Sequence, residues 1–396
     1  MDSHYALLGG APAFNEMVPV GQLYFPSWER YETAMRDIFN RRYYTNQGPL
    51  VRQFEAELQQ YLNVKHVICV VNATIGLMMA AEALGLKGKV ILPSFTFLAS
   101  AQSLQWVGIE PVFCDVDPET HQMDVGHLET LIDDDVSGIM GVNLWGGACD
   151  VQALQAVATR HGIALYFDSA HAFGCEVNGK KIGGFGDMEV FSFHATKVLS
   201  TTEGGCICTN DDELAARLRN IRSSYGAGNP VSVVKTSNGR MSEAQGAIGL
   251  LNLEDFEANR QKNESLFQVY QRELEGVSGI KVVKAAGVSR SNHQYMVCQI
   301  DDDVFGLTRD ELVKVLAAEN INARRYFYPG THRSIGFLDN PSGAPGKLPV
   351  TEHLCQNCIQ LPIGALVEED MVVRVCGLIR GIQACKDQLK SAVVGL

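Results

Sequence analysis

The sequence predicts an α/β fold in which a large domain with a mostly parallel, seven-stranded sheet precedes a smaller C-terminal α+β domain. Between residues 67 and 209, short apolar runs alternate with segments of helical periodicity, which is the pattern of βαβ units and a parallel sheet. From about residue 280 this alternation gives way to a mixed pattern. At 396 residues, the chain is also longer than one hydrophobic core usually supports.

The elements of the large domain follow from the apolar runs and from the helical spacing between them. We expect strands at residues 67–71, 90–92, 112–114, 138–142, 164–167, 188–193 and 206–209. We expect helices at residues 26–39, 50–61, 75–84, 96–106, 126–132, 151–161 and 211–223. The first 20 residues are weakly patterned and should form an arm with a break at Gly9-Gly10.

A loop rich in Gly, Ser and Asn, at residues 224–238, precedes the smaller domain. Beyond it we expect helices at 242–274 and 308–319, strands at 295–300, 323–326 and 358–361, a Pro/Gly-rich loop at 329–347 and a final helix from about 368. We divide the chain into an arm with its helix (1–40), a large domain (41–260) and a small domain (261–396). The boundary between the last two lies within the long helix.

Composition excludes several classes of protein. The 33 Lys and Arg residues against 45 Asp and Glu give a net charge of −12, which argues against a nucleic-acid-binding surface. The N-terminus lacks the pattern of a signal peptide, and polar residues interrupt the most apolar window, so we expect no membrane span. Eleven scattered cysteines fit reduced thiols and a cytoplasmic location. We interpret the single Cys-x-x-Cys, Cys355 to Cys358, as structural thiols, because no second pair completes a zinc site.

One lysine lies between two predicted strands. The apolar run from Met188 to Phe193 turns sharply polar, delivers Lys197 and, after Gly204-Gly205, continues into a second β-like run. Desolvation there would disfavour the ammonium form of Lys197 and make its amine a nucleophile for Schiff-base chemistry. Taken alone, however, the segment favours an ordinary lysine in a loop between strands. The other strand ends are needed to distinguish the two interpretations.

Polar residues also follow other strands, at the positions where parallel sheets bind ligands. Asp168 leaves a buried strand as a carboxylate, and His171 follows three residues later. A buried Asp needs a partner such as a cationic ring nitrogen, although capping of the following turn would equally explain it. The segment Asn72-Ala-Thr-Ile-Gly76 opens a helix whose N-terminal amides would bind an anion. Simple capping by Asn72 or Thr74 is the alternative.

An aromatic residue and a hydroxyl complete the pattern. Phe97 follows a strand and would lie against a flat ring or simply in the core, and Ser192 would join the anion site or be a plain strand residue. Together the strand ends supply an anion cradle, an aromatic plane, a carboxylate and a lysine. Pyridoxal phosphate needs these groups for its phosphate, ring, pyridine nitrogen and aldehyde. The joint pattern therefore favours a cofactor-binding lysine over an ordinary one.

The same residues carry a resemblance to a known family. From about Gly48 to Ile363 the chain resembles the DegT/DnrJ/EryC1/StrS sugar aminotransferases, which have the aspartate aminotransferase fold, pyridoxal-phosphate fold type I. The markers are Asp168-Ser-Ala-His171, Ser192-Phe-His-Ala-Thr-Lys197 with Glu203-Gly-Gly205, Ser237-Asn-Gly-Arg-Met241 with Ala247-Ile-Gly-Leu250, and Ala323-Arg-Arg-Tyr-Phe-Tyr-Pro329 with His332.

The resemblance implies roles for three catalytic residues. Lys197 would carry the cofactor aldehyde and act as the base of the 1,3-proton transfer, Asp168 would face the pyridine nitrogen, and His171 would lie near the ring hydroxyl. Some members of the family are dehydratases that have histidine in place of the lysine. The presence of Lys197 therefore implies a transaminase, and no metal is implied.

The resemblance also implies how the cofactor is held. Ala73, Thr74 and Ser192 would bind its phosphate, and Phe97 would stack on its ring. Asn238 would reach the phosphate from the other subunit, so that a homodimer would be needed for a complete site.

The finer resemblance implies a substrate. Ser192-Phe-His-Ala-Thr-Lys197 and the segment at 43–49 are most similar to enzymes that aminate C4 of a nucleotide-linked (TDP) 4-keto-6-deoxy sugar. L-Glutamate would supply the amino group and leave as 2-oxoglutarate, with pyridoxamine phosphate between the half-reactions. A C3 keto-sugar or keto-cyclitol aminotransferase is the nearest alternative. A non-catalytic regulatory protein of the same fold is more remote, and a dinucleotide-binding dehydrogenase lacks its G-x-G-x-x-G.

Overall fold

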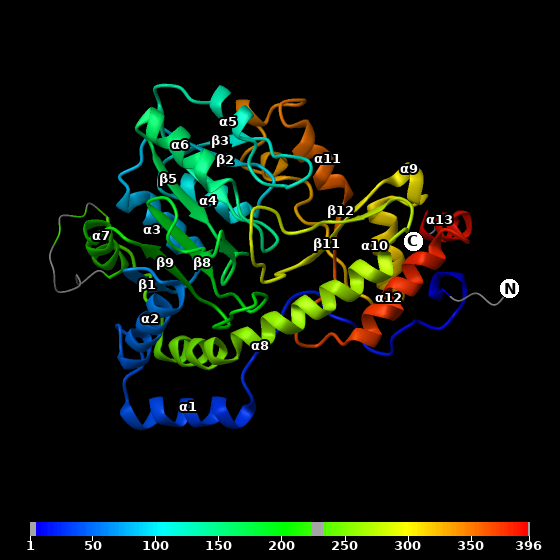
Figure 1. The fold of residues 1–396 in the computed structure, drawn as a ribbon, viewed down its shortest axis with the longest axis horizontal. Helices are drawn as coiled ribbons and strands as arrows, with labels where there is room; N and C mark the ends of the chain where they lie inside the picture. Colours follow the sequence, from blue (N-terminus) through cyan, green and yellow to red (C-terminus); the bar gives the residue numbers. More distant parts are fainter. Residues whose placement is uncertain (1–4, 224–230, 232, 234, 395–396) are drawn as a thin grey trace.

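A computed structural model describes residues 5–223, 231, 233 and 235–394, and a seven-stranded sheet of order β1-β9-β8-β5-β4-β2-β3 lies at its centre (Figure 1). Its strands are β1 (His66–Val70), β2 (Lys89–Pro93), β3 (Glu110–Cys114), β4 (Val136–Val142), β5 (Ala164–Asp168), β8 (Met188–Ser192) and β9 (Gly205–Thr209). Among these strands of the described chain, β9 alone runs antiparallel to its neighbours. The expected mostly parallel sheet is confirmed, and its parallel strands end at one edge.

Helices cover both faces of this sheet, as βαβ units require. One face carries α3 (Ala73–Ala83), α4 (Leu98–Trp106) and α7 (Asp212–Arg222). The other carries α2 (Pro49–Leu62), α5 (Val125–Thr130), α6 (Val151–His161) and the first part of α8 (Glu243–Leu274). Neighbouring strand residues enter opposite cores: Val190 packs under α3, and Phe191 packs toward α2. Burial on both faces explains why the strands are continuous apolar runs.

The smaller unit is built on an antiparallel sheet of order β10-β11-β12. Its elements are β10 (Ile280–Val282), β11 (Met296–Ile300), β12 (Cys358–Leu361), α9 (Asp302–Phe305), α10 (Arg309–Ala318), α11 (Pro349–Asn357), α12 (Glu369–Ile382) and α13 (Lys386–Val394). Helix α8, yellow-green in Figure 1, joins the two units, because Phe256 packs under the large sheet and Tyr270 packs in the smaller core. The division of this continuous helix at residue 260 stays a prediction.

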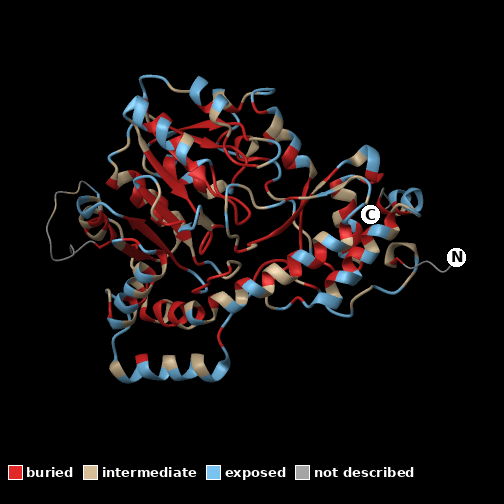
Figure 2. Cartoon of the chain, viewed as in Figure 1, coloured by how far each residue is buried: buried red, intermediate tan, exposed pale blue. Residues whose placement is uncertain are grey.

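The N-terminal segment packs against the smaller unit. The buried Tyr5 donates its hydroxyl to the Leu378 carbonyl at 2.6 Å, and Val18 forms a bridge with Ile321. The 3₁₀ helix η1 (Ala6–Leu8) ends at Gly9, where a φ of +94° requires the conformational freedom of glycine. Helix α1 (Trp28–Arg41) lies along the outside of α8 and is largely exposed (Figures 1 and 2).

The expected strand at 323–326 is wrong. Arg324 makes an isolated bridge with Gln360, and the backbone then turns. The Tyr328 N–H donates to the Arg325 carbonyl at 2.7 Å, and the Gly330 N–H donates to the Phe327 carbonyl at 2.6 Å. The first of these bonds uses the Arg325 carbonyl, which a strand over 323–326 could have offered to a neighbouring strand.

Several short elements were not expected. They are β6 (Glu176–Val177), β7 (Lys180–Lys181), β10, α9, α11, α13 and, within the loop predicted at 329–347, η2 (Thr331–Arg333) and η3 (Pro341–Gly343). Most of the loop predicted at 224–238 lies outside the described residues. Within the described ranges, no helix combines the length and apolar sequence that crossing a bilayer requires.

The eleven cysteines all lie in described residues and are free. All but Cys385 are buried. Cys355 and Cys358 pack in the same apolar cluster as Phe95 and Phe327, as structural thiols would.

Candidate active site

One cavity of about 360 Å³ lies where the parallel strands end. Its walls come from the start of α3, the loops after β2, β5 and β8, the start of β11 and the turn after residue 323. The residues predicted from the sequence that line it are Ala73, Thr74, Phe97, Asp168, His171, Ser192 and Lys197. Asn238 is exposed and lies outside the lining.

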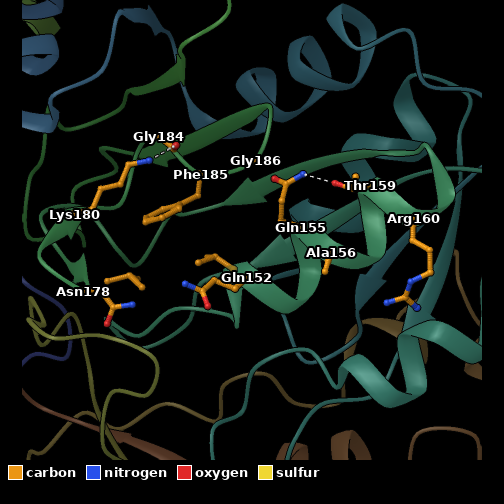
Figure 3. Close-up of a pocket in the computed structure, with 12 residues that line it drawn as sticks. Gln152, Gln155, Ala156, Thr159, Arg160, Asn178, Lys180, Gly184, Phe185 and Gly186 are labelled. Atoms are coloured by element: carbon orange, nitrogen blue, oxygen red, sulfur yellow. Dashed lines mark hydrogen bonds between the residues drawn. The ribbon is translucent and has the colours of Figure 1, made fainter.

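A larger cavity of about 920 Å³ is an open groove between α6 and the β6–β7 hairpin (Figure 3). Its two cations already have partners. Lys180 Nζ donates to the Gly184 carbonyl at 2.9 Å, and Arg160 pairs with Glu129 at 2.6 Å. The described residues that line the groove include no Asp, Glu, His or Cys. The smaller cavity is therefore the candidate active site.

Asp168 ends β5 with a buried carboxylate. Its Oδ2 accepts a hydrogen bond from Ser100 Oγ at 2.8 Å, and its Oδ1 accepts one from the Ala170 N–H at 3.1 Å. Burial raises the pKa of this carboxyl above its ordinary value, whereas the two hydrogen bonds and the charge of Lys197 act in the opposite direction. A buried carboxylate on a cavity wall is suited to pair with a cationic N–H group of a ligand.

His171 presents a buried polar atom that lacks a partner. Its Nδ1 makes no hydrogen bond to any described residue. Burial, together with the charge of Lys197, lowers the pKa of His171 well below its ordinary value, so the imidazole is neutral. Trp145 stacks on the ring at 5.5 Å between centroids, and Tyr295 contacts it edge-on at 4.9 Å. An unpartnered buried nitrogen on a cavity wall indicates a ligand that supplies the missing hydrogen bond.

The start of α3 forms an anion-binding corner. The amides of Ala73 and Thr74 open the helix and have no intrahelical acceptors. Asn72 does cap the helix, accepting from the Ile75 N–H at 2.9 Å, so capping and anion binding are compatible. Gly205, which pairs with Ser192 in the β8–β9 ladder, lies directly behind: a Cβ there would be 2.9 Å from the Ala73 nitrogen. Glycine therefore lets β9 approach the corner.

Lys197 projects from a firmly held segment into the cavity. The Val198 N–H donates to Gln294 Oε1, and Gln294 Nε2 donates to the Thr196 carbonyl, each at 3.1 Å, so one side chain holds the backbone on both sides of the lysine. Lys197 Nζ lies 3.4 Å from Tyr295 Oη. Burial raises the pKa of Tyr295, but the charge of Lys197 and nearby hydrogen bonds outweigh it, so this pKa lies below its ordinary value.

The sequence predicts no individual role for Ser100, Gln294, Tyr295, Arg324 or Tyr326, although the resemblance implies that the loop at 324–333, with Arg324 and Tyr326, helps to build the sugar pocket. Ser100 lies in the first turn of α4, and Gln294 and Tyr295 directly precede β11 of the smaller unit, so no local pattern distinguishes them. Arg324 and Tyr326 lie in the Ala323–Pro329 marker stretch. The turn found in place of the expected strand brings both to the cavity wall, with the guanidinium 5.8 Å from the Tyr326 ring centroid.

These groups fit pyridoxal phosphate, the cofactor that the resemblance implies. The cavity wall presents a carboxylate for a pyridine nitrogen, an unpartnered imidazole nitrogen for the ring hydroxyl, helix amides with a hydroxyl for the phosphate, and a lysine for the aldehyde. Phe97, which would stack on the ring of the cofactor, is 55% exposed. The cavity is therefore open to solvent on the side of Phe97.

Comparisons with known proteins agree with this fit. The model of the DegT/DnrJ/EryC1/StrS aminotransferase family matches residues 28–380. The chain is 34% identical over 365 residues to a dTDP-4-amino-4,6-dideoxy-D-glucose transaminase of Shigella dysenteriae, covering 92% of this chain and 98% of the relative. It is 36% identical over 287 residues to a GDP-perosamine synthase of Caulobacter vibrioides, covering 71% and 77%.

The solved structures extend the likeness to three dimensions. The crystal structure of DesI in the presence of its TDP-sugar product is 37% identical, with a TM-score of 0.93 over 98% of each chain. The family match spans nearly the whole chain, and the cavity residues suit the cofactor that the family uses. The chain therefore belongs to the DegT/DnrJ/EryC1/StrS aminotransferase family, with pyridoxal phosphate as its cofactor.

Proposed function

We propose that this protein transfers the amino group of L-glutamate to C4 of a TDP-linked 4-keto-6-deoxy sugar, giving a 4-amino-4,6-dideoxy sugar. The observation that carries the proposal is the convergence of Lys197, Asp168 and the amides of α3 on one cavity. The sugar is supported by the Shigella dysenteriae transaminase and DesI, whose likeness covers nearly the whole chain.

Bound pyridoxal phosphate supplies an electron sink that acidifies the proton on the amine-bearing carbon of the substrate. Asp168 keeps a proton on the pyridine nitrogen, on which the strength of that sink depends. Lys197 Nζ would act as the base of the 1,3-proton transfer, removing the proton from the amine-bearing carbon of the substrate and returning it two bonds away, at the carbon that was the aldehyde of the cofactor. This role requires an unprotonated and precisely placed amine. Gln294 provides the placement by fixing the backbone on both sides. The keto sugar is aminated by the same residues acting in reverse order.

The proposed substrates are both anionic, although the chain carries a net charge of −12. Arg324 supplies local positive charge on the cavity wall. Among the described residues, no carboxylate lies within ion-pair distance of its guanidinium. Arg324 is therefore available to a carboxylate of glutamate or to a diphosphate, because guanidinium groups bind both.

Turnover of a substrate panel tests the proposed reaction. With glutamate, the holoenzyme should aminate a TDP-4-keto-6-deoxy hexose, and kcat/KM should exceed the value for the TDP-3-keto isomer at least about tenfold, because a misplaced carbonyl cannot reach the reacting centre. A GDP-linked 4-keto sugar and a keto-cyclitol complete the panel. Turnover of 3-keto but not 4-keto sugars would sink the proposal.

The proposed assembly is a homodimer in which Asn238 of one subunit completes the cavity of the other. Asn238 is exposed and lies outside the cavity of its own chain, which supports a role in a second copy. Helix α1 and its flanks expose large aromatic side chains, among them Trp28 (66%) and Phe39 (73%). Exposed aromatic surface of this kind is typical of subunit contacts.

Mixing two inactive variants tests this shared site. Lys197→Ala and Asn238→Ala homodimers should each be impaired, and subunit exchange between them should restore activity. If the site is shared, one of the two sites in each mixed dimer combines an intact Lys197 with an intact Asn238 from the other chain. If Asn238 acted within its own chain, every site would lack one residue and mixing would restore nothing. Light scattering of the wild type checks that the dimer forms.

A further inference from the structure

A chain of buried hydroxyl groups leads to Asp168. Ser100 Oγ lies 2.8 Å from Asp168 Oδ2 and 2.8 Å from Thr96 Oγ1. Ser100 is 0% exposed and Thr96 is 2% exposed, so water does not compete for these contacts. Thr96 directly precedes Phe97, the N-cap of α4, and Ser100 lies in the first turn of that helix.

The chemistry fixes the direction of this hydroxyl chain. An ionised carboxylate only accepts hydrogen bonds, so the single proton of Ser100 Oγ must be donated to Asp168. The Ser100 oxygen is then left as an acceptor, and Thr96 Oγ1 is the donor that it accepts from. Thr96 therefore keeps the Ser100 proton pointed at the carboxylate, because any other rotation would lose one of the two bonds.

The Thr96 end of the chain is held by the C-terminal part of the molecule. Thr331 Oγ1 donates to the Thr96 carbonyl at 3.0 Å, and the Thr331 N–H donates to the Ser94 carbonyl at 3.3 Å. Thr331 is 2% exposed and follows the turn that carries Arg324 and Tyr326 to the cavity. One end of the hydroxyl chain is therefore held by Asp168, and the backbone at its other end is held by Thr331.

The groups around Asp168 make the hydrogen bond from Ser100 important for keeping the carboxylate ionised. Lys197, from the loop after β8, is the titratable group that acts on Asp168. Tyr166 on β5 is itself affected by the charge of Asp168, and His171 lines the same cavity. Tyr166 and His171 are neutral, and Lys197 is the residue that engages the cofactor aldehyde. Ser100 is therefore the principal protein side chain that opposes the effect of burial, which favours the uncharged carboxylic acid.

We infer that Ser100, oriented by Thr96, is a positioning residue that keeps Asp168 ionised and aimed at the pyridine nitrogen of the cofactor. Neither hydroxyl touches the reacting atoms, and both act through the carboxylate. The inference concerns the cofactor and not the sugar, so it stands or falls independently of the proposed substrate.

The test is the pH dependence of cofactor affinity in Ser100→Ala, measured by dialysis of pyridoxal phosphate from the holoenzyme. Without the donor, the pKa of Asp168 rises further, so the carboxylate is lost at a higher pH as the solution is acidified. The affinity of Ser100→Ala should be about tenfold weaker than that of the wild type at mildly acidic pH, with the difference shrinking toward alkaline pH. Thr96→Val keeps Ser100 but removes the hydroxyl that donates to it. This variant should also bind the cofactor more weakly at acidic pH, but by a smaller factor than Ser100→Ala.

Two further variants complete the design. Ser100→Thr retains the hydroxyl and should restore wild-type behaviour. Ser103→Ala is the matched control, because Ser103 is a fully buried hydroxyl on the same helix that donates to the Ser100 carbonyl and does not contact Asp168. An affinity loss in Ser100→Ala that is equal at every pH, or no loss at all, overturns the inference.

Discussion

Replacing Lys197 by Ala should lower the rate of both half-reactions at least about a thousandfold, because the variant loses the group that engages the cofactor aldehyde and the base that moves the proton. The fold should survive. The backbone on either side of residue 197 is held by Gln294, and those hydrogen bonds do not use the lysine side chain. Single-turnover kinetics with glutamate and, separately, with the keto sugar measure the two half-reactions.

Borohydride reduction supplies a second measurement for Lys197. Reduction of the wild type should bleach the yellow holoenzyme and leave the cofactor attached to Lys197, as peptide mapping will show, whereas the Ala variant should retain no label. Lys181→Ala is a suitable control, because this half-buried lysine, which donates to the Tyr61 carbonyl at 2.8 Å, lies outside the cavity. Clear residual turnover in Lys197→Ala would refute the proposed role.

Replacing Asp168 by Asn should lower kcat by about a hundredfold or more, because an amide of the same shape cannot keep the pyridine nitrogen protonated and the electron sink weakens. The pH profile should change as well. In the wild type, activity is lost as the pH falls through the pKa of Asp168, which burial raises above its ordinary value. The Asn side chain does not titrate, so this decline should disappear from the profile of the variant.

Asp115→Asn is the matched control for Asp168→Asn. Asp115 directly follows β3, is as buried as Asp168 at 6% exposure, and accepts hydrogen bonds from Thr351 at 2.7 Å. It lies outside the lining of the cavity, so its replacement should affect thermal stability more than kcat. If Asp168→Asn retained wild-type kcat and the same pH profile, the pairing with the pyridine nitrogen would be excluded.

The architecture of the large unit was readable in the chain because its signals are local. Strands buried on both faces are continuous apolar runs, and the helices between them begin at side-chain caps such as Asn72 and Asp150. The fold class and nearly all the long elements were predicted correctly for this reason. Wrong predictions, such as the strand expected at 323–326, occur where contacts between distant residues determine the backbone conformation. A single sequence gives no signal of such contacts.

The residue types that parallel strands deliver to one sheet edge, including Asp168, Ser192 and Lys197, can be predicted from the chain. Their convergence follows from strand direction alone, because each strand end carries its next residue to the same place. Which side chains support Asp168 and Lys197 depends instead on how distant segments pack in the folded protein. Ser100 reaches Asp168 from 68 residues away, and Tyr295 reaches Lys197 from 98 residues away. These contacts form because separate layers of the fold pack together. Packing of this kind produces no periodic pattern in the sequence from which it could be predicted.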